Sequence, residues 1–455
     1  MKIRLTAILA VLFVFSTACQ SLYGDTTQVA YPTVSPDDDN TVIDTAEVIV
    51  VGGSLAGFSA AVSAARELDY YNNPGKVIWL ADIDYRCLGG QATCAQVSMW
   101  DQKAVDPAVG NDYWLQQSMN GEYDKAGVQY QCRAAHTFCP NPRDLEAEIR
   151  AWATYWNIEV IFTKIHQIVP GMLTSKVVTG IGTFVSDVVV EATEDGSMIP
   201  ASMSWQPQCQ QPDTLAYMIV PPNEPHDGLI SEFKNYGYPD LSQQAKDYLL
   251  GNDPQTPEFL RFNGYRYTVS LRGNDGYGLN RFNDAYTYEN AKDKTYQQLS
   301  FLANQPQYAN WAYLKPYYLY NRTSEYRLIG KYHKTNAPRG VNSHYFSIAV
   351  FGYRADSHGG CDVNATEPDG QYDFPAWSCM PANGTNFLVA MPRSCDISDL
   401  VASSARMQPD ELDAGEGIGL LAATAAHYNI NVTNVSPELV MSRLEQVGQK
   451  VKVDG

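Results

Sequence analysis

Glu47-Val-Ile-Val-Val-Gly-Gly-Ser-Leu-Ala-Gly57 is the stretch that decides the fold, and an Ala-rich segment, residues 58–66, follows it directly. Its Val48–Val51 run is β-branched and typical of a strand buried on both faces. Gly52 suits a tight turn, and Gly57 suits close packing of the next helix against that strand. Backbone N–H groups at the start of the helix would face a pyrophosphate. The pattern predicts a dinucleotide-binding strand–turn–helix, and the alternative is a glycine-rich turn that binds no ligand.

Two further features bear on this motif. Ser54 replaces the middle glycine of the usual fingerprint, and its side chain would narrow the room for a phosphate. A second apolar run, Lys76–Asp82, predicts the next strand and ends in a carboxylate about 25 residues beyond the fingerprint. Asp82 or Asp84 is therefore placed to accept hydrogen bonds from a ribose hydroxyl. The alternative for each of them is a solvated loop carboxylate.

Together with Leu88-Gly89-Gly90-Gln91-Ala92-Thr93, these residues resemble the FAD-dependent oxidoreductases of the two-dinucleotide-binding-domain flavoprotein superfamily. Residues 188–196 resemble the family's Asp-Ala-Thr-x-x-Gly strand end, with Glu191 in place of Asp. Residues 403–426 resemble an Arg-x-x-Pro and Gly-x-x-x-Gly pattern that leads into an Ala-rich helix. The resemblance implies FAD as the cofactor and the following cofactor-binding residues: Gly52, Gly53, Ser54, Gly57, Asp82, Gly89, Gly90, Gln91, Ala192, Thr193, Gly196, Arg406, Gly415 and Gly419.

Gly415 and Gly419 open the Ala-rich helix near the C-terminus. The resemblance implies that the N-terminus of this helix points at the pyrimidine side of the flavin, where the reduced ring carries negative charge. Glycines four residues apart also permit close packing of two helices, and packing is the alternative explanation of this spacing.

The segment 205–345 differs from the rest of the chain, because Tyr, Asn, Gln and Pro dominate it. Its tyrosines offer flat surfaces with polar tips, which suit sugars or other polyhydroxylated ligands. An aromatic-rich core or interface is the alternative. The tyrosines in question are Tyr265, Tyr267, Tyr277, Tyr286, Tyr288, Tyr313, Tyr317, Tyr318 and Tyr320.

His358 is the first catalytic candidate, because it lies in a segment that resembles the family's Asp-x-His sequence. A neutral imidazole suits the removal of a proton as hydride leaves for the flavin. Asp356 would orient this histidine or only cap a turn, and Arg327 would hold a carboxylate or hydroxyl of the substrate. Family members often carry a histidine a few residues after the position of Cys395, where this chain has Asp399.

The N-terminus predicts export. Lys2 and Arg4 precede a short apolar run and the small residues that end at Cys19. Residues 1–18 are predicted to be a signal peptide, and residues 19–45 a tether. Cys19 would be lipidated, or the chain would be cleaved by an ordinary signal peptidase. We therefore expect the periplasm or the cell surface, with a membrane-anchored lipoprotein as one form.

Charge and cysteine content narrow the classes further. The chain has 32 Lys plus Arg against 50 Asp plus Glu, and a formal charge of −18 excludes a nucleic-acid binder as the default. Eight cysteines beyond Cys19 favour disulfides in an exported protein. The pairs expected are Cys132 with Cys139 and Cys361 with Cys379. No short Cys-x-x-Cys pair occurs, so no metal site is predicted.

The expected architecture is α/β: a Rossmann-like, three-layer FAD-binding domain with a mostly parallel sheet, and an inserted α+β substrate domain. Residues 46–204 and 346–445 would form the FAD-binding domain, 205–345 the substrate domain, and 446–455 a tail. The hypothesis is an exported oxidoreductase that transfers hydride between a small organic substrate and FAD, with oxygen or a membrane carrier as electron acceptor. The alternatives are a non-catalytic surface binding protein on a degenerate scaffold, and a reductase that takes electrons from an exported redox partner.

Overall fold

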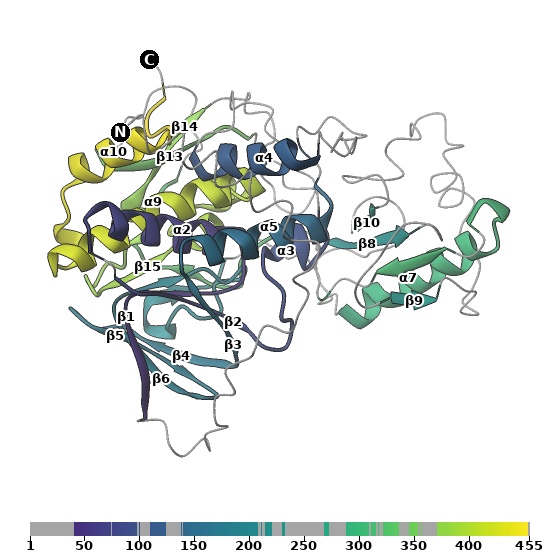
Figure 1. Ribbon diagram of the computed structural model, residues 1–455. Helices are drawn as coiled ribbons and strands as arrows, with labels where there is room; N and C mark the ends of the chain where they lie inside the picture. The colour runs from purple at the N-terminus through teal and green to yellow at the C-terminus, as the bar shows by residue number, and fades with distance from the viewer. Residues whose placement is uncertain are drawn as a thin grey trace.

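The computed structural model describes residues 41–73, 75–97, 100, 110–123, 138, 140–207, 211, 214–220, 230–232, 268–272, 288–308, 311–314, 317, 322–335, 345–353, 355 and 371–453. A seven-stranded sheet in the order β3-β2-β1-β6-β5-β4, with β15 also paired to β6, forms the centre of the larger body (Figure 1). These strands are β1 (Val42–Val51), β2 (Val77–Asp82), β3 (Glu159–Thr163), β4 (Ile165–Val169), β5 (Ser175–Thr179), β6 (Gly182–Glu191) and β15 (Phe387–Val389).

The sheet is parallel where the sequence motifs lie. β1 pairs in parallel with β2 on one side and with β6 on the other, and β3 and β15 extend the parallel part. β4 and β5 continue from β6 in antiparallel fashion. Val48–Val51 is fully buried, as a strand covered on both faces requires. The carboxyl ends of β1 and β6 meet, because Val51 pairs with Glu191. Loops that follow these strands are therefore neighbours.

Two helices cover one face of the sheet side by side: α2 (Leu55–Tyr70) and α9 (Gln408–Tyr428) (Figure 1). Small residues let them approach closely, because a Cβ added to Gly415 or Gly419 would collide with the backbone of Ala56 or Ala60 in α2. β13 (Ser347–Phe351) and β14 (Tyr372–Pro375) form an antiparallel pair beyond α9. The remaining helices of this body are α3 (Gly90–Thr93), α4 (Gly110–Tyr123), α5 (Pro142–Tyr155), α8 (Asp399–Ser404) and α10 (Pro437–Val447).

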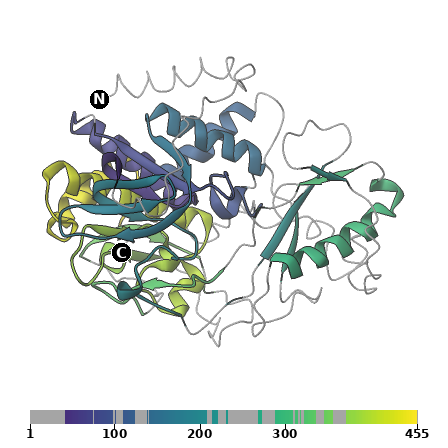
Figure 2. The same ribbon diagram turned by 90° about the horizontal axis from the view of Figure 1, so that it is seen from below.

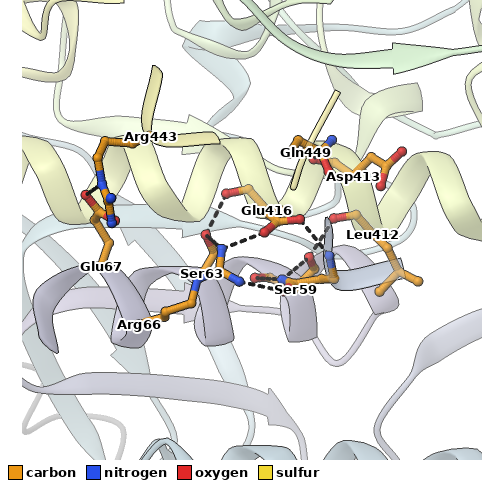
Figure 3. A network of polar contacts seen from close by, with 10 residues as sticks. Ser59, Ser63, Arg66, Glu67, Leu412, Asp413, Glu416, Arg443 and Gln449 are labelled. Atoms are coloured by element: carbon orange, nitrogen blue, oxygen red, sulfur yellow. Dashed lines mark hydrogen bonds and ion pairs between the residues drawn. The ribbon is translucent and has the colours of Figure 1, made fainter. Parts of the chain in front are cut away.

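Polar contacts fix the α2–α9 pair in register, as Figure 3 shows. Ser63 Oγ donates to the carbonyl of Glu416 at 2.8 Å, and Arg66 pairs with the Glu416 carboxylate at 2.5 Å. The backbone N–H of Asn111, at the start of α4, donates to the same carboxylate at 2.7 Å. One buried glutamate thus joins three helices, and its charge is balanced where it lies.

A second, smaller part of the chain lies to one side of this body in both views (Figures 1 and 2). Its antiparallel sheet has the order β10-β8-β11-β9, and α7 (Tyr288–Ala303) accompanies it. The strands are β8 (Thr214–Val220), β9 (Ile230–Glu232), β10 (Thr268–Arg272) and β11 (Ala312–Leu314). Two short strands at its base, β7 (Ser204–Trp205) and β12 (Arg327–Leu328), pair with each other.

The predicted fold class is confirmed: the central sheet is mostly parallel, and helices cover it. The two strands expected at 48–51 and 76–82 are present as β1 and β2, and the Ala-rich helices as α2 and α9. The domain boundaries drawn from sequence stay predictions. Within the part of the chain that the structure describes, no helix is both long and apolar enough to cross a membrane.

Candidate FAD site

The turn between β1 and α2 can be built only with glycine at two positions. Gly52 has φ +119°, and a Cβ there would collide with the backbone of Ala192 at the end of β6. Its N–H donates to the carbonyl of Leu80 at 2.8 Å, and its carbonyl accepts Trp79 Nε1–H at 2.7 Å. A Cβ on Gly57 would meet the carbonyl of Gly52. The backbone of three strands and one helix therefore converges at this turn without intervening side chains.

Ser54 is the N-cap of α2, and this role explains why serine stands in the fingerprint. Its Oγ accepts the N–H of Gly57 at 3.0 Å and donates to the carbonyl of Ala192 at 2.6 Å. The side chain is buried and bonded within the protein. The N–H groups of Leu55 and Ala56, also in the first turn, have no partner inside the helix. A helix start of this kind binds anions, so the hydroxyl need not displace a phosphate.

Asp82 ends β2 beside this turn, because Leu80 of β2 pairs with Val51 of β1. Lys164 binds Asp84 at 2.7 Å and reaches Asp82 at 3.4 Å. The backbone N–H of Asp84 also donates to Asp82 at 2.8 Å. Both carboxylates thus stay at the carboxyl edge of the sheet, where a ribose would lie. Which of the two would bind it stays open.

The Gly89–Gly90 loop lies directly over the β1–α2 turn. The N–H of Gly89 donates to the carbonyl of Gly53 at 2.7 Å. Gly90 has φ +53°, and a Cβ there would lie 2.9 Å from Cα of Ser54. The N–H of Gln91 donates to the carboxylate of Glu194. The loop therefore presents a backbone N–H to a carboxylate oxygen beside the dinucleotide turn. A backbone N–H is the kind of donor that a phosphate requires.

The segment after β6 closes the third side of the site. Glu191 is fully buried at the strand end, and its Oε1 accepts the N–H of Thr193 at 3.0 Å. Burial raises the pKa of Glu191 to about 8, so this carboxyl is mostly protonated at neutral pH. Ala192 contacts the turn at Gly52. Gly196 has φ +72°, and a Cβ added to it would collide with the carbonyl of Tyr326. Ala192 and Thr193 thus lie against the β1–α2 turn, and Gly196 lies against Tyr326.

A buried network joins these loops to the start of α9. Gln91 Nε2 donates to Glu411 at 2.5 Å, and Arg393 pairs with the same carboxylate at 2.6 Å. Arg393 also donates from Nε to the carbonyl of Glu194 at 2.9 Å. Burial raises the pKa of Glu411 to about 8 although Arg393 acts in the opposite direction. The network holds four separate segments in one arrangement.

The first turns of α9 carry further buried acids. Burial raises the pKa of Asp410 and of Asp413 well above the ordinary range, because it disfavours the charged form of each carboxyl. A shift in this direction reduces the negative charge that would oppose the positive end of the helix. Arg406 is buried just before the helix, where its Nε donates to the carbonyl of Ser403 at 3.2 Å and its own carbonyl accepts Gln91 Nε2 at 3.4 Å.

The spacing of Gly415 and Gly419 is explained by packing against α2, the alternative that the sequence left open. A direct contact of either glycine with a cofactor stays a prediction. Their effect on the site is to set the position of α9, and with it the position of the helix N-terminus.

A family model, described as FAD dependent oxidoreductase, matches residues 47–445. The chain belongs to this family. The family is that of FAD-dependent oxidoreductases, so the predicted family and its cofactor are confirmed. Enzymes of this kind pass two electrons, usually as a hydride, through the flavin ring. The glycine-lined turn and the N–H groups at the start of α2 fit the pyrophosphate part of such a cofactor, whereas the N–H of Gln91 is bound to Glu194.

One solved structure similar to this chain is a flavoprotein/dehydrogenase from Cytophaga hutchinsonii, with 11% sequence identity and a TM-score of 0.38. The match covers 88% of this chain and 84% of that protein. A thioredoxin reductase from Streptococcus pyogenes matches with 17% identity over 33% of this chain and 35% of that one, at a TM-score of 0.21. A mutant flavin monooxygenase from Stenotrophomonas maltophilia matches with 16% identity over 37% of this chain and 42% of that one, at a TM-score of 0.22. The chain thus spans about a third of the thioredoxin reductase. No curated protein sequence matches the chain.

Arg327, expected to hold substrate, is buried in the flavoenzyme and bound to protein groups. Its Nη1 pairs with Asp399 at 2.7 Å and donates to the carbonyl of Ile397 at 3.0 Å, and its Nε donates to the carbonyl of Arg393 at 3.2 Å. The guanidinium also lies over the Trp205 ring at 5.3 Å. Through these contacts Arg327 holds the segment 393–399, and only 1% of it is exposed. A contact between Arg327 and a substrate stays a prediction.

Asp399 also explains a departure from the family sequence. It stands where family members often have histidine, and here it is the ion-pair partner of Arg327. His358 and Asp356, the other two catalytic candidates, lie outside the residues that the structure describes. Their roles stay predictions.

A histidine–carboxylate pair that the sequence did not reveal joins His333 to Asp396, which belongs to the segment 393–399. His333 Nδ1 and Asp396 Oδ1 are 2.5 Å apart, and Asp396 Oδ2 accepts the N–H of Gly330 at 2.9 Å. The His333 side chain is 44% exposed, whereas that of Asp396 is 11% exposed. A carboxylate that orients one ring nitrogen leaves the other able to take a proton. The partners are far apart in sequence, and no local motif marks them.

Two disulfides are present among the described residues. Cys87 is joined to Cys94, and Cys379 to Cys395. The second pair shows that the expected Cys361–Cys379 bond is wrong: the Gly/Pro/Asn-rich stretch between Cys361 and Cys379 favoured that pair, but the fold brings Cys395, 16 residues after Cys379, next to it. The expected Cys132–Cys139 bond lies outside the described residues. No group of three or more metal-ligating side chains occurs within those residues.

Proposed function

We propose that this flavoenzyme works outside the cytoplasm and transfers a hydride between a small organic substrate and FAD. The observation that supports FAD binding most strongly is the convergence of three glycine-containing backbone segments at the carboxyl ends of β1 and β6. They are the turn at Gly52, the loop at Gly90 and the segment 192–196. A Cβ at Gly52 or Gly90 would collide there with its neighbours, which include the Glu194 carboxylate, and the N–H groups at the start of α2 would face an approaching anionic dinucleotide.

Export is supported by the N-terminal sequence and by the chemistry of the cysteines. Residues 1–18 have the pattern of a signal peptide. Disulfides persist in oxidising compartments, and two are present in the fold. We therefore place the protein in the periplasm or on the cell surface, with Cys19 as a candidate lipid anchor.

A polyhydroxylated substrate, such as a sugar, is our preferred class. The proposal rests on the tyrosine-rich composition of 205–345, because the C–H faces of sugars pack on aromatic rings. Of the tyrosines on which it rests, Tyr317 has a described side chain, which is 40% exposed. Its backbone N–H donates to the carbonyl of Cys94.

Removal of a hydride from an alcohol carbon requires a base for the hydroxyl proton. We assign this role to His358, on the sequence argument. The His333–Asp396 pair is the alternative, because its geometry already suits proton transfer.

The test is anaerobic mixing of the purified holoenzyme with panels of polyols, aldoses, hydroxy acids and amino acids, followed by absorbance of the flavin. The proposal predicts bleaching by a polyhydroxylated compound, and a fall of roughly 100-fold or more in the bleaching rate of His358→Asn at saturating substrate. His333→Asn is the matched control and should retain the rate. If His333→Asn loses the rate instead, the base is His333. Bleaching by none of these classes, in a protein that holds flavin, would contradict the substrate proposal and favour a reductase that receives electrons from an exported partner.

A further inference from the structure

The Cys87–Cys94 disulfide encloses the loop that lies over the dinucleotide turn. Its Cα atoms are 5.8 Å apart, and the residues between them include Gly89 and Gly90. A Cβ added to Gly53 would lie 3.0 Å from the carbonyl oxygen of Cys87. The bridge is therefore part of the same backbone layer as the residues assigned to FAD.

The other side of this disulfide meets the tyrosine-rich segment. The N–H of Tyr317 donates to the carbonyl of Cys94 at 2.9 Å. Figures 1 and 2 show the segment around α3 between the central sheet and the part that carries β8, β10 and α7. The bridge thus lies where the two parts of the molecule meet, with the FAD loops on one side and the proposed substrate segment on the other.

Polar groups surround the two sulfur atoms. Oε2 of Glu146 lies 3.6 Å from Cys87 Sγ, and Thr93 Oγ1 lies 3.3 Å from Cys94 Sγ. Arg150 holds the Glu146 carboxylate at 2.6 Å from the adjacent turn of α5. If the bond were reduced, the carboxylate could accept the S–H of Cys87. The Thr93 hydroxyl donates its single proton to the carbonyl of Leu88 at 2.5 Å.

The second disulfide has no such setting. Cys379 and Cys395 are both fully buried, and Cys395 Sγ contacts the backbone carbonyls of Val389 and Met391, at 3.5 and 3.6 Å. A carbonyl neither supplies nor stores a proton. The two bridges therefore serve as an internal comparison, one with acid–base partners at the FAD loop and one without.

We propose that Cys87 and Cys94 form a dithiol–disulfide couple that exchanges two electrons with the flavin. This inference rests on the proposed function. In the forward step the S–S bond would accept two electrons and break, and the reduced flavin of the holoenzyme would be their source and become oxidised. One sulfur leaves as a thiol that takes the proton released by the flavin, and the other leaves as a thiolate. Glu146 is the positioning residue that receives this S–H.

The test uses the full-length holoenzyme under anaerobic conditions. Dithionite is added in steps, the flavin is followed by absorbance, and each sample is quenched in acid, alkylated and mapped by peptide mass spectrometry. A flavin alone takes about two electrons, so a coupled disulfide raises the total to about four per chain. We expect alkylation of Cys87 and Cys94 to rise while the flavin bleaches, and Cys379 and Cys395 to stay oxidised.

Two results would overturn the relay. One is a fully reduced flavin with Cys87 and Cys94 still joined. The other is equal reduction of this bridge in protein stripped of FAD, which would show that dithionite acts on it directly. A Cys87→Ala/Cys94→Ala variant should keep the flavin spectrum and take about two electrons. If that variant does not fold, the mapping of the unaltered protein still decides.

The role of Glu146 is tested by the rate of electron transfer from flavin to disulfide after a rapid reduction. Glu146→Gln should slow this rate by at least about tenfold. Glu148→Gln is the control, because Glu148 lies on the same helix and its carboxylate accepts a hydrogen bond from Trp152 Nε1. This variant should not slow the rate. An unchanged rate in Glu146→Gln would remove this residue from the relay. A protein that contains no flavin would refute the proposed function itself, and its oxidised spectrum would show this before any thiol is counted.

Discussion

At the residue scale, the β1–α2 turn depends on the absence of a side chain at Gly52. We expect Gly52→Ala to destabilise the fold by roughly 3 kcal/mol or more, because strain at φ +119° adds to a collision with the backbone of Ala192. Gly448→Ala is the matched control, since Gly448 has φ +98° but no atom within 4 Å of its added Cβ. It should cost only about 1–2 kcal/mol. Urea unfolding measures both, and equal losses would show that crowding at the turn is unimportant.

Glu194 controls the charge of the FAD loops. Its carboxylate accepts the N–H of Gln91, so it competes for a donor that would serve a phosphate, and it repels that phosphate. We expect Glu194→Gln to tighten FAD binding several-fold, by about 1 kcal/mol. Asp195→Asn, a neighbouring neutralisation, is the control. Titration of FAD-stripped protein with FAD, followed by flavin fluorescence, measures the change. Weaker binding in Glu194→Gln would mean that this carboxylate supports the cofactor.

At the scale of elements, sequence reasoning succeeded where the signal is local. The β-branched run of β1, the second strand β2 and the Ala-rich helices α2 and α9 were all predicted, because each pattern lies within one element. It failed where no sequence pattern relates the partners. Such partners are Arg327 and Asp399, His333 and Asp396, and Cys379 and Cys395, of which the last two are only 16 residues apart.

The three-residue strand β15 illustrates the same limit. Phe387–Val389 is too short to show a period, yet it extends the parallel part of the sheet beside β6. The candidate site divides in the same way. Its glycines could be read from motifs, whereas the buried network of Gln91, Arg393 and Glu411 required the fold.

The contact between α2 and α10 depends on a buried ion pair. Glu67 is fully buried, and Arg443 binds it at 2.9 Å while lying over the ring of Tyr70. We expect Arg443→Met to cost about 3–5 kcal/mol, because an unpaired carboxylate stays in the core. The exposed pair of Lys164 and Asp84 supplies the control, and Lys164→Met should cost less than about 1 kcal/mol.

Thermal and urea unfolding of these variants measure the difference. Adding Glu67→Met to Arg443→Met should recover most of the lost stability, since the buried charge is then gone. A double variant as unstable as Arg443→Met would show that shape, and not the unpaired charge, explains the loss.

At the scale of the whole molecule, the buried acids should make stability fall as pH rises. The folded pKa of Glu191 is about 8, above its ordinary value near 4.5, because burial disfavours the charged form. The folded state therefore binds the proton more tightly. The contribution of Glu191 to the free energy of unfolding is complete below about pH 4.5 and is lost as pH rises to about 8. Between these values the free energy of unfolding falls by up to about 1.4 kcal/mol per pH unit.

Glu191→Gln should flatten this slope, because an amide keeps an acceptor for the N–H of Thr193 and carries no charge. Glu445→Gln, on the exposed face of α10, should leave the slope unchanged. Urea unfolding at intervals between pH 5 and 8 measures the free energy for each protein. A slope in Glu191→Gln equal to that of the unaltered protein would exclude Glu191 as its source.

The most direct test of the central claim, that this fold is a working FAD enzyme, is the visible spectrum of the purified mature protein before and after denaturation. We predict a flavin spectrum at about one FAD per chain. Flavin in the supernatant after denaturation would show non-covalent binding, and flavin left on the chain would show a covalent link. A colourless protein that also takes up no added FAD would contradict the account and leave a binding protein on a flavoprotein scaffold.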